Sequence, residues 1–256
     1  MIDIHCHMLP GLDDGPDTLD DAVRMAEAAA ADGIRRVVCT PHSNDMYKFD
    51  PEVNVRRRDE LQARIGPRLE LLTGCDFHMN FENLQDAEKN PSKYTIAGKN
   101  YLLVEFADFS IPPSMDDALH KLMIDGLRPI ITHPERNPVL CRHPERIDQW
   151  ITMGCAVQVT AGSLTGRFGN RAQQMAERWL DSGRVHFIAT DAHDTKSRPP
   201  RMREVFELIA ARRGADVASA LCVENPRAAT EGAELPYVPD ISAASVEKPR
   251  KGWKFW

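Results

Sequence analysis

The strongest constraint on the fold of this chain is a set of metal-ligand residue types that recur where strand-like runs end. In the first seven residues, Ile2 and Ile4 alternate with polar neighbours, which predicts a short strand whose end presents His5 and His7. Side chains two positions apart on a strand point to the same side, so both imidazoles can reach one ion. Later strand-like runs end at residues of the same types, namely His42, Asp76, Glu105, His133, Asp191 and His193.

The segments between these residues alternate between strand and helix patterns. Thr18 is a typical N-cap and Gly33 a typical helix stop, so the first helix should lie between them and lead to an apolar strand at residues 36–40. The alternation continues for about seven β/α repeats. An α/β barrel and an open doubly wound sheet both fit such repeats. We favour the barrel, with the metal site at the C-terminal ends of the strands, because the opposite edges of an open sheet could not bring ligands to one point.

The composition narrows the class of protein. Of the 256 residues, 42% are hydrophobic and 27% charged, as in soluble globular proteins, and the net charge of -6 argues against a dedicated nucleic-acid binder. No run is long enough to cross a bilayer, and the first residues resemble a core strand rather than a signal peptide. The six cysteines lie far apart without a CxxC motif, which favours free thiols over disulfides. We therefore expect a cytoplasmic protein.

The end of the chain differs from the rest. Residues 241–245 are typical of a linker, and residues 248–256 are basic and aromatic. We therefore predict a catalytic domain at residues 1–235 and a flexible basic, aromatic tail at residues 236–256. An alternative role for the tail is weak contact with an anionic membrane surface or a partner, because interleaved Lys and Trp suit an interface.

The number and chemistry of the candidate ligands predict a metal cluster. With Asp14 from the turn-rich loop added, the candidates are His5, His7, Asp14, His42, Asp76, Glu105, His133, Asp191 and His193. This set is too large for one ion and suits two or three divalent ions. Mixed imidazole and carboxylate ligation fits Mn, Fe or Zn. Such a cluster acidifies water and stabilises phosphoryl transfer.

Two arginines are candidates for anion recognition. Arg136 lies three residues after His133, and Arg198 lies five after His193, so both should flank the mouth of the metal site. Guanidinium groups match phosphate oxygens in pairs and balance charge in the transition state. The remaining histidines have no partner at ligand spacing and are predicted to be ordinary surface or core residues: His78, His120, His143 and His186. Cys6 should point away from His5 and His7.

At this point several motifs resemble a known superfamily. The segments 3–7 (DIHCH), 40–42 (TPH), 133–136 (HPER) and 191–193 (DAH) are similar to those of the PHP (polymerase and histidinol phosphatase) superfamily. The opening segment MIDIHCHMLPGLDDGP at residues 1–16 resembles one branch more closely, the bacterial manganese-dependent tyrosine-protein phosphatases of capsule and exopolysaccharide gene clusters. The segment 198–200 (RPP) also fits that branch. The resemblance extends from Met1 to about Asn225.

The resemblance implies a distorted (β/α)7, TIM-like barrel that holds three metals, with manganese favoured. By position, the first metal would be held by His5, His7, Asp76 and Asp191, the second by Asp76, Glu105 and His133, and the third by Asp14, His42 and His193. Arg136 and Arg198 match the phosphate-binding arginines of the family. One position departs from the pattern, because the family usually has glutamate where Asp76 stands. The shorter side chain leaves the bridging role open between Asp76 and Glu105.

The implied activity is that of a metal-dependent phosphoric monoester hydrolase acting on phosphotyrosine. In the family the substrate is an autophosphorylating tyrosine kinase that controls polysaccharide assembly. No cysteine here is followed by arginine six positions on, the spacing that a cysteine-dependent tyrosine phosphatase requires. The alternatives are another PHP phosphoesterase (a histidinol-phosphate phosphatase or a small nucleotide phosphodiesterase), an amidohydrolase, which also opens with His-x-His, and a non-enzymatic metal-binding regulator.

Overall fold

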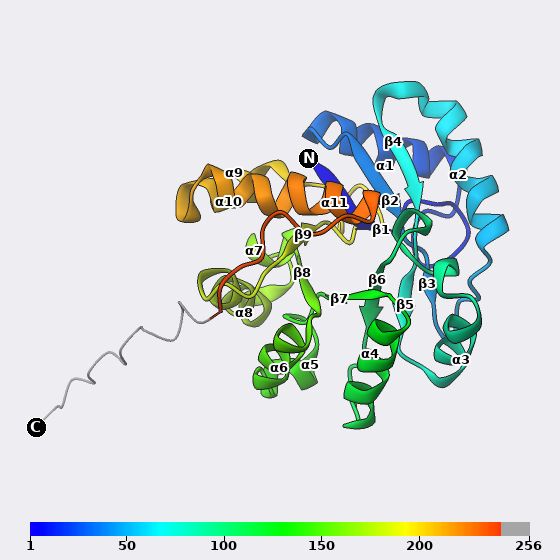
Figure 1. The fold of residues 1–256 in the computed structure, drawn as a ribbon. Coiled ribbons are helices and arrows are strands. Elements are labelled where there is room, and N and C mark those ends of the chain that lie inside the picture. The colour runs from blue at the N-terminus through cyan, green and yellow to red at the C-terminus, as the bar shows by residue number, and fades with distance from the viewer. Residues whose placement is uncertain (242–256) are drawn as a thin grey trace, which may run out of the picture.

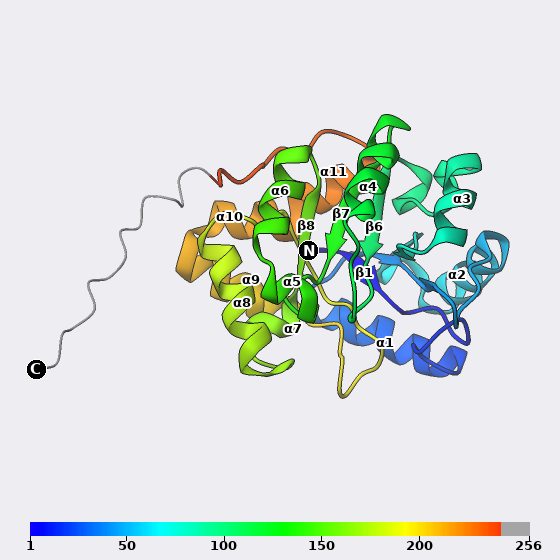
Figure 2. The same cartoon turned by 90° about the horizontal axis from the view of Figure 1, so that it is seen from below.

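The computed structural model describes residues 1–241 and consists of parallel strands with helices packed around them (Figures 1 and 2). The strands are β1 Ile2–Cys6, β2 Arg36–Cys39, β3 His42–Ser43, β4 Glu70–Thr73, β5 Asp76–His78, β6 Tyr101–Glu105, β7 Arg128–Thr132, β8 Ala156–Thr160 and β9 Phe187–Ala189. The helices are α1 Leu19–Asp32, α2 Pro51–Ile65, α3 Phe81–Lys89, α4 Ser114–Ile124, α5 Pro138–Arg142, α6 Glu145–Met153, α7 Ala161–Leu164, α8 Gly169–Asp181, α9 Arg203–Arg213, α10 Ala215–Ser219 and α11 Asn225–Glu231. Short 3-10 turns (Gly66–Arg68, Pro91–Lys93, Ile96–Gly98) and a π-helical turn (Ala220–Glu224) complete the set.

The strands form two hydrogen-bonded sheets, and every pairing in them is parallel. One sheet has the order β1-β2-β4 and the other β3-β5-β6-β7-β8-β9. The chain passes directly from the first sheet to the second twice, from β2 to β3 across Pro41 and from β4 to β5 across Gly74. Pro41 has no N–H to donate to a neighbouring strand. At Gly74 a Cβ atom would lie only 2.8 Å from Cγ1 of Val38, so the close approach of the two segments requires glycine.

The alternation of side chains along each strand carries polar residues from the core to one end of the sheets. In β6, Tyr101 and Leu103 share a face with Glu105, and both belong to a buried apolar cluster. Phe187 and Ala189 of β9 lie in the same cluster, and Asp191 follows them with the same spacing. In β6 and β9 the apolar side chains of this face are thus buried in the core. The polar residue that comes next on the same face, Glu105 or Asp191, lies at or just after the C-terminal end of the strand.

The predicted α/β class with parallel strands is confirmed, and several local signals were interpreted correctly. The Thr18 side chain accepts a hydrogen bond from the backbone of Asp21 at the start of α1, and Gly33 ends that helix with φ 97°. Helix α2 has the predicted bounds. Three helices were not predicted, α3, α5 and α7, because polar loop-like sequences or short length hid them. The closed seven-unit barrel stays a prediction.

Two further expectations concern the membrane and the tail. Among residues 1–241 no helix is both long and apolar enough to span a bilayer. Tyr237 is joined to Asn225 by two hydrogen bonds, with the Asn225 amide donating to the Tyr237 carbonyl at 2.7 Å. The rest of the predicted tail, from residue 242 onward, and its proposed membrane or partner contact lie outside the described residues.

His186 is a buried histidine that should couple stability to pH. Its side chain lies in the core, and its Nδ1 atom accepts a hydrogen bond from the Val157 N–H at 3.2 Å. Burial lowers the pKa of His186 from 6.5 to about 4. Between these values the unfolded chain binds a proton that the folded chain does not. The contribution of His186 to the free energy of unfolding is therefore complete above pH 6.5. It falls by up to about 3 kcal/mol as the pH drops to 4.

Urea unfolding of the parent and of His186→Gln between pH 7 and 4 measures this effect. The glutamine amide can still accept from Val157 but does not titrate, so the variant should lose less stability over the same interval. Equal losses in the two proteins would show that His186 is not responsible.

Candidate metal centre

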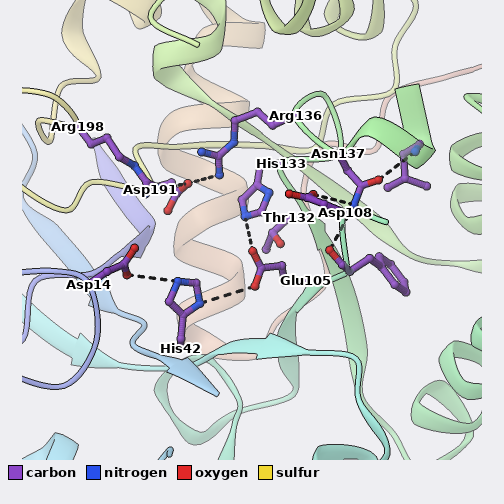
Figure 3. Close-up of a pocket in the computed structure, with 12 residues that line it drawn as sticks. Asp14, His42, Glu105, Asp108, Thr132, His133, Arg136, Asn137, Asp191 and Arg198 are labelled. Carbon is purple, nitrogen blue, oxygen red and sulfur yellow. Dashed lines mark hydrogen bonds and ion pairs between the residues drawn. The ribbon is translucent and has the colours of Figure 1, made fainter. Parts of the chain in front are cut away.

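The candidate ligands meet beside a cavity of about 280 Å³. Glu105 ends β6, and His133 and Asp191 follow β7 and β9, whereas His42 and Asp76 begin the short strands β3 and β5. The cavity is lined by Asp14, His42, Glu105, Phe106, Asp108, Thr132, His133, Arg136, Asn137, Leu140, Asp191 and Arg198. Figure 3 shows Arg136 and Arg198 directed toward Asp191 from two sides, with His133, Glu105 and His42 forming a chain of close contacts below them. Residues far apart in sequence therefore build one site.

All nine candidate ligands belong to four overlapping groups whose ligand atoms lie within 4.8 Å of one another. The groups are His7, Asp14, His42 and His193; His5, His7 and Asp76; His5, His133 and Asp191; and His42, Asp76 and Glu105. None of the four groups equals a set implied by the resemblance. His7 joins the third set, His42 takes the place of His133 beside Asp76 and Glu105, and Asp191 lies with His5 and His133, apart from His7 and Asp76. His133 also approaches Glu105, with Nε2 and Oε1 3.6 Å apart.

The end of β1 brings His5 and His7 together. Their Nε2 atoms lie 3.3 Å apart, and both rings are buried. The segment after β9 fixes this end of the strand, because the Asp191 N–H donates to the His5 carbonyl and the His7 N–H donates to the Ala192 carbonyl, each at 2.8 Å. The Cys6 side chain lies in the apolar core, so the prediction that it points away from the two imidazoles agrees with the structure.

Asp76 stands at the centre of the cluster, at the start of β5. It is completely buried, and its Oδ2 atom lies 3.1 Å from Nδ1 of His42 and 3.5 Å from Nε2 of His5. Glu105 approaches the same His42 nitrogen at 3.7 Å from the cavity side. Both carboxylates therefore flank one imidazole, and the short side chain of Asp76 still reaches the cluster.

Asp191 joins the cluster to the two arginines. Its Oδ1 atom lies 3.5 Å from Nε2 of His5 and 3.4 Å from Nε2 of His7. Its Oδ2 atom accepts from Arg136 and, at 2.6 Å, from Nη2 of Arg198. The two oxygens of Asp191 thus have different partners, because Oδ1 faces the imidazoles and Oδ2 accepts from two guanidinium groups. The arginines flank the mouth, as predicted.

Two of the candidate ligands have an unfavourable backbone conformation. His133 has φ 32° and Asp191 has φ 51°, and neither is glycine. Such conformations cost about 1–3 kcal/mol each and persist only where the surroundings enforce them. His133 directly follows β7 and Asp191 lies two residues after β9, and both side chains belong to the cluster. This strain is a sign of function that the sequence does not display.

The protonation states of the cluster follow from burial and from its carboxylates. Burial alone would lower the pKa of His7, but the charge of Asp13 raises it to about 9. The pKa of His42 rises to about 11 in spite of burial, because the carboxylates of Asp14 and Asp76 lie close to its ring. Burial and the charge of Arg136 hold the pKa of His133 well below its usual value. The carboxylates thus make the cluster attractive to positive charge, whether protons or metal ions.

Unpartnered polar atoms give the clearest sign that divalent ions fit here. Several buried nitrogen and oxygen atoms have no hydrogen-bond partner among the residues that the structure describes: Nδ1 of His42, both carboxylate oxygens of Asp76 and Nε2 of His193. Burying such groups without partners is costly, and they are metal-ligand atom types. A mixture of imidazole nitrogens and carboxylate oxygens suits divalent metal ions, and which metal binds stays a prediction.

Asp13 and Gln158 support the ligands and were missed in the sequence. Asp13 accepts from the His42 N–H at 3.1 Å and lies 2.6 Å from Nδ1 of His7, which leaves Nε2 of His7 free to bind a metal. Gln158 in the middle of β8 places its Oε1 atom 3.0 Å from Nδ1 of His5. The adjacent acidic residues Asp13 and Asp14 in a glycine-rich turn were a usable signal. Gly15 is required there, since a Cβ atom would lie 2.4 Å from the His7 carbonyl oxygen.

The other histidines lie largely where they were predicted. His120 and His143 are exposed, and His186 is a core residue. His78 is half-buried with Nδ1 3.4 Å from Oε2 of Glu105, so it contacts a candidate ligand and is not an isolated surface residue. The spacing rule missed this contact because β5 and β6 are neighbours only in the folded sheet.

The cysteines offer no nucleophile at this cavity. All six are free, and all but Cys141 are buried. Burial raises the pKa of their thiols, to about 12 for Cys155 and Cys222, so the reactive thiolate is disfavoured. None of them lines the cavity, which agrees with the missing Cys-x5-Arg spacing.

The fold and the site define an α/β protein with a candidate cluster of metal ligands at the strand ends and an arginine pair at its mouth. Residues 1–231 match the family described as "Capsular polysaccharide synthesis, CpsB/CapC", and the chain belongs to this family.

Two similar proteins and a similar solved structure support the membership of this family. Tyrosine-protein phosphatase YwqE of Bacillus subtilis (strain 168) is 33% identical over 239 residues, which cover 92% of this chain and 91% of that protein. Putative tyrosine-protein phosphatase CapC of Staphylococcus aureus is 32% identical, covering 80% and 82%. A crystal structure from a study of YwqE and of Streptococcus pneumoniae CpsB, described there as metal-dependent tyrosine phosphatases, has a TM-score of 0.88 at 31% identity and covers 94% of this chain and 98% of its own. A lactonase from Listeria monocytogenes shares only the fold, with a TM-score of 0.57 at 10% identity.

The contact between Asp13 and His7 generates a test of the metal centre. Replacing Asp13 with asparagine keeps the shape but removes the charge that orients His7. Metal affinity should fall by about 10- to 100-fold, as is usual for such supporting carboxylates. Competition with a chelating dye measures the manganese affinity. Asp17→Asn, an exposed position in the same loop, is the matched control and should bind like the parent; unchanged affinity in Asp13→Asn would contradict this role of Asp13.

Proposed function

We propose that this protein is a metal-dependent protein-tyrosine phosphatase. The observation that carries the proposal is the shared position of Asp191, which touches the imidazole cluster through one oxygen and both arginines through the other. A group bound between the metal centre and the arginines would contact both, and a phosphate monoester has the charge and the oxygens for that place. Membership of the CpsB/CapC family and its relatives named tyrosine-protein phosphatases support the substrate class.

We further propose that the nine ligands hold two or three divalent ions, of which manganese is favoured and iron and zinc are alternatives. Asp14, His42 and His193, joined by His7, form the largest of the ligand groups found among the described residues. Asp76 and Glu105 both flank His42, so either can bridge two ions. Bound divalent ions supply Lewis-acid chemistry, acidifying water and neutralising charge on the phosphoryl group.

The residues of the chain would bind and orient the ester. Arg136 and Arg198 reach the mouth of the cavity and can each present two N–H groups to phosphate oxygens. Phe106 and Leu140 provide the apolar part of the lining, where the ring of a phosphotyrosine can lie. Asn137 is held by its own hydrogen bonds to the carbonyls of Phe106 and Ala107, which keeps this wall in place. Charge that develops on the phosphoryl oxygens would be stabilised by the fixed guanidinium groups.

The proposed partner is an autophosphorylating tyrosine kinase that controls capsular or exopolysaccharide synthesis. The capsular role named for the family supports this proposal. Residues 1–235 would form the catalytic domain. We also infer that the two sheets form one distorted (β/α)7 barrel, because β2 with β3 and β4 with β5 act as single interrupted strands, and the end of β1 is hydrogen-bonded to the segment after β9.

The substrate class can be tested directly. The manganese-loaded protein should hydrolyse a phosphotyrosine peptide with kcat/KM at least about tenfold above that for histidinol phosphate, since its apolar wall suits an aromatic ring. Removal of metal with a chelator should abolish both activities, and added manganese should restore them. A preference for histidinol phosphate would support another phosphoesterase of the superfamily instead.

The arginines provide a second test. Arg198→Ala should lower kcat/KM by about 10²- to 10³-fold, because it removes a fixed positive charge from the phosphate site. The metal content, measured by elemental analysis, should not change, since Arg198 contacts only one oxygen of Asp191. Arg201→Ala, an exposed arginine in the same loop, is the control and should be as active as the parent. Loss of metal in Arg198→Ala would show that this arginine supports the cluster instead of the substrate.

A further inference from the structure

A single aromatic ring lies against both arginines of the site. The Phe168 ring centroid is 4.5 Å from Cζ of Arg136 and 5.9 Å from Cζ of Arg198. Both distances are within the range of cation–π attraction. Phe168 lies between α7 and α8 and is only half-buried, and it does not line the metal cavity. It therefore contacts the two arginines without being a ligand or a wall of the cavity.

The segment that carries Phe168 is a short, hydrogen-bonded turn. The Arg167 N–H donates to the Gly162 carbonyl at 2.9 Å, and the Gly169 N–H donates to the Gly166 carbonyl at 3.0 Å. Gly166 and Gly169 have φ values of 78° and 84°, which favour glycine. An added Cβ atom at Gly162 would lie 3.0 Å from Cε2 of Phe168, so the ring packs closely on the backbone of α7.

Glu135 holds the segment before this turn by hydrogen bonds. It is buried, and its Oε1 atom accepts from the Thr160 N–H at 3.0 Å and from Oγ of Ser163 at 2.7 Å. Glu135 therefore fixes the start of α7, while its neighbour in sequence, Arg136, places its guanidinium group on Phe168. The adjacent residues Glu135 and Arg136 thus contact the start of α7 and the Phe168 ring, respectively.

The loop that carries Arg198 is tied to the same turn. Nη1 of Arg167 donates to the Ser197 carbonyl at 3.3 Å. Within the loop, Oδ1 of Asp194 accepts from the backbone N–H groups of Ser197 at 2.6 Å and Arg198 at 3.3 Å. The Arg198 carbonyl in turn accepts from the His193 N–H at 2.9 Å. The Phe168 ring therefore contacts both arginines, and its neighbour Arg167 is hydrogen-bonded to the loop that carries Arg198.

The two positively charged guanidinium groups repel each other, so their side-by-side arrangement at Asp191 needs a stabilising contact. Both donate to one oxygen of Asp191, which supplies a single negative charge. The Nε atoms of both are buried, and within the described part of the chain they have no hydrogen-bond partner. The electron-rich face of the Phe168 ring attracts the cations without competing for the N–H groups that a phosphate would accept from. An acidic residue in its place would take up those donors.

We propose that Phe168 is a positioning residue that holds Arg136 and Arg198 side by side in the arrangement that receives the phosphate group. The proposal rests on the proposed phosphatase function for its role in turnover, but its binding part concerns inorganic phosphate alone. Loss of the ring frees the arginines to separate, so phosphate binds less tightly and the reacting ester is held less well.

The test compares Phe168→Leu, which removes the ring, with Phe168→Tyr, which restores it, in the manganese-loaded full chain. Phosphate affinity is measured by titration calorimetry, and kcat and KM are measured with a phosphotyrosine peptide. Leucine should weaken phosphate binding and lower kcat/KM by about 2- to 30-fold, as expected for loss of cation–π attraction. Tyrosine should return both within about twofold of the parent. Phe206→Leu in α9, another half-buried phenylalanine, is the matched control and should change neither.

The same substitution in an Arg136→Ala background separates positioning from a merely structural role. If Phe168 acts through the arginines, Phe168→Leu should cause a much smaller further loss there. Equal losses in both backgrounds, a fall in metal content, or unchanged phosphate affinity would overturn the proposal. Phe168→Met replaces the leucine variant if that protein does not fold. A parent that binds phosphate more tightly than Phe168→Leu but hydrolyses no ester would refute the phosphatase function and leave the positioning role intact.

Discussion

The site depends on how the negative charge of two buried carboxylates, Asp76 and Asp191, is balanced. An ionised carboxylate without partners is very costly in the interior of a protein. Asp191 is balanced by two arginines on one oxygen and by imidazoles near the other. Asp76 is approached by the imidazoles of His5 and His42, and neither of its oxygens has a hydrogen-bond partner in residues 1–241. A cation between these groups resolves this imbalance, and for this reason the cluster is best understood as a metal centre.

The parallel strands make this concentration of charge possible. β6 illustrates how this happens, because it buries apolar side chains such as Leu103 along its length and carries Glu105 at its C-terminal end. The turns that follow then aim the side chains, and at His133 and Asp191 this requires a strained backbone. Strain of this kind is held in place by the surrounding structure. The rigid strands and helices thus support a site that would not be stable as an isolated loop.

Asp191 also couples the two halves of the site. The arginines that would bind phosphate are the same groups that balance Asp191, so substrate and metal centre share one charged neighbour. Phe168 and Glu135 add a second layer of support behind these arginines. This arrangement would allow the arginines to receive a phosphate group beside a carboxylate-rich centre, as proposed above.

The sequence by itself determined the α/β class, most helix and strand positions and the residue types that meet in the site. It did so because strand alternation, N-caps such as Thr18 and ligand pairs such as His5 and His7 are local patterns. Only the tertiary structure decided which ligands are neighbours, that Asp13 and Gln158 orient the imidazoles, and that Phe168 lies on both arginines. These contacts join strands and loops distant in the chain, and no local spacing encodes the register that brings them together.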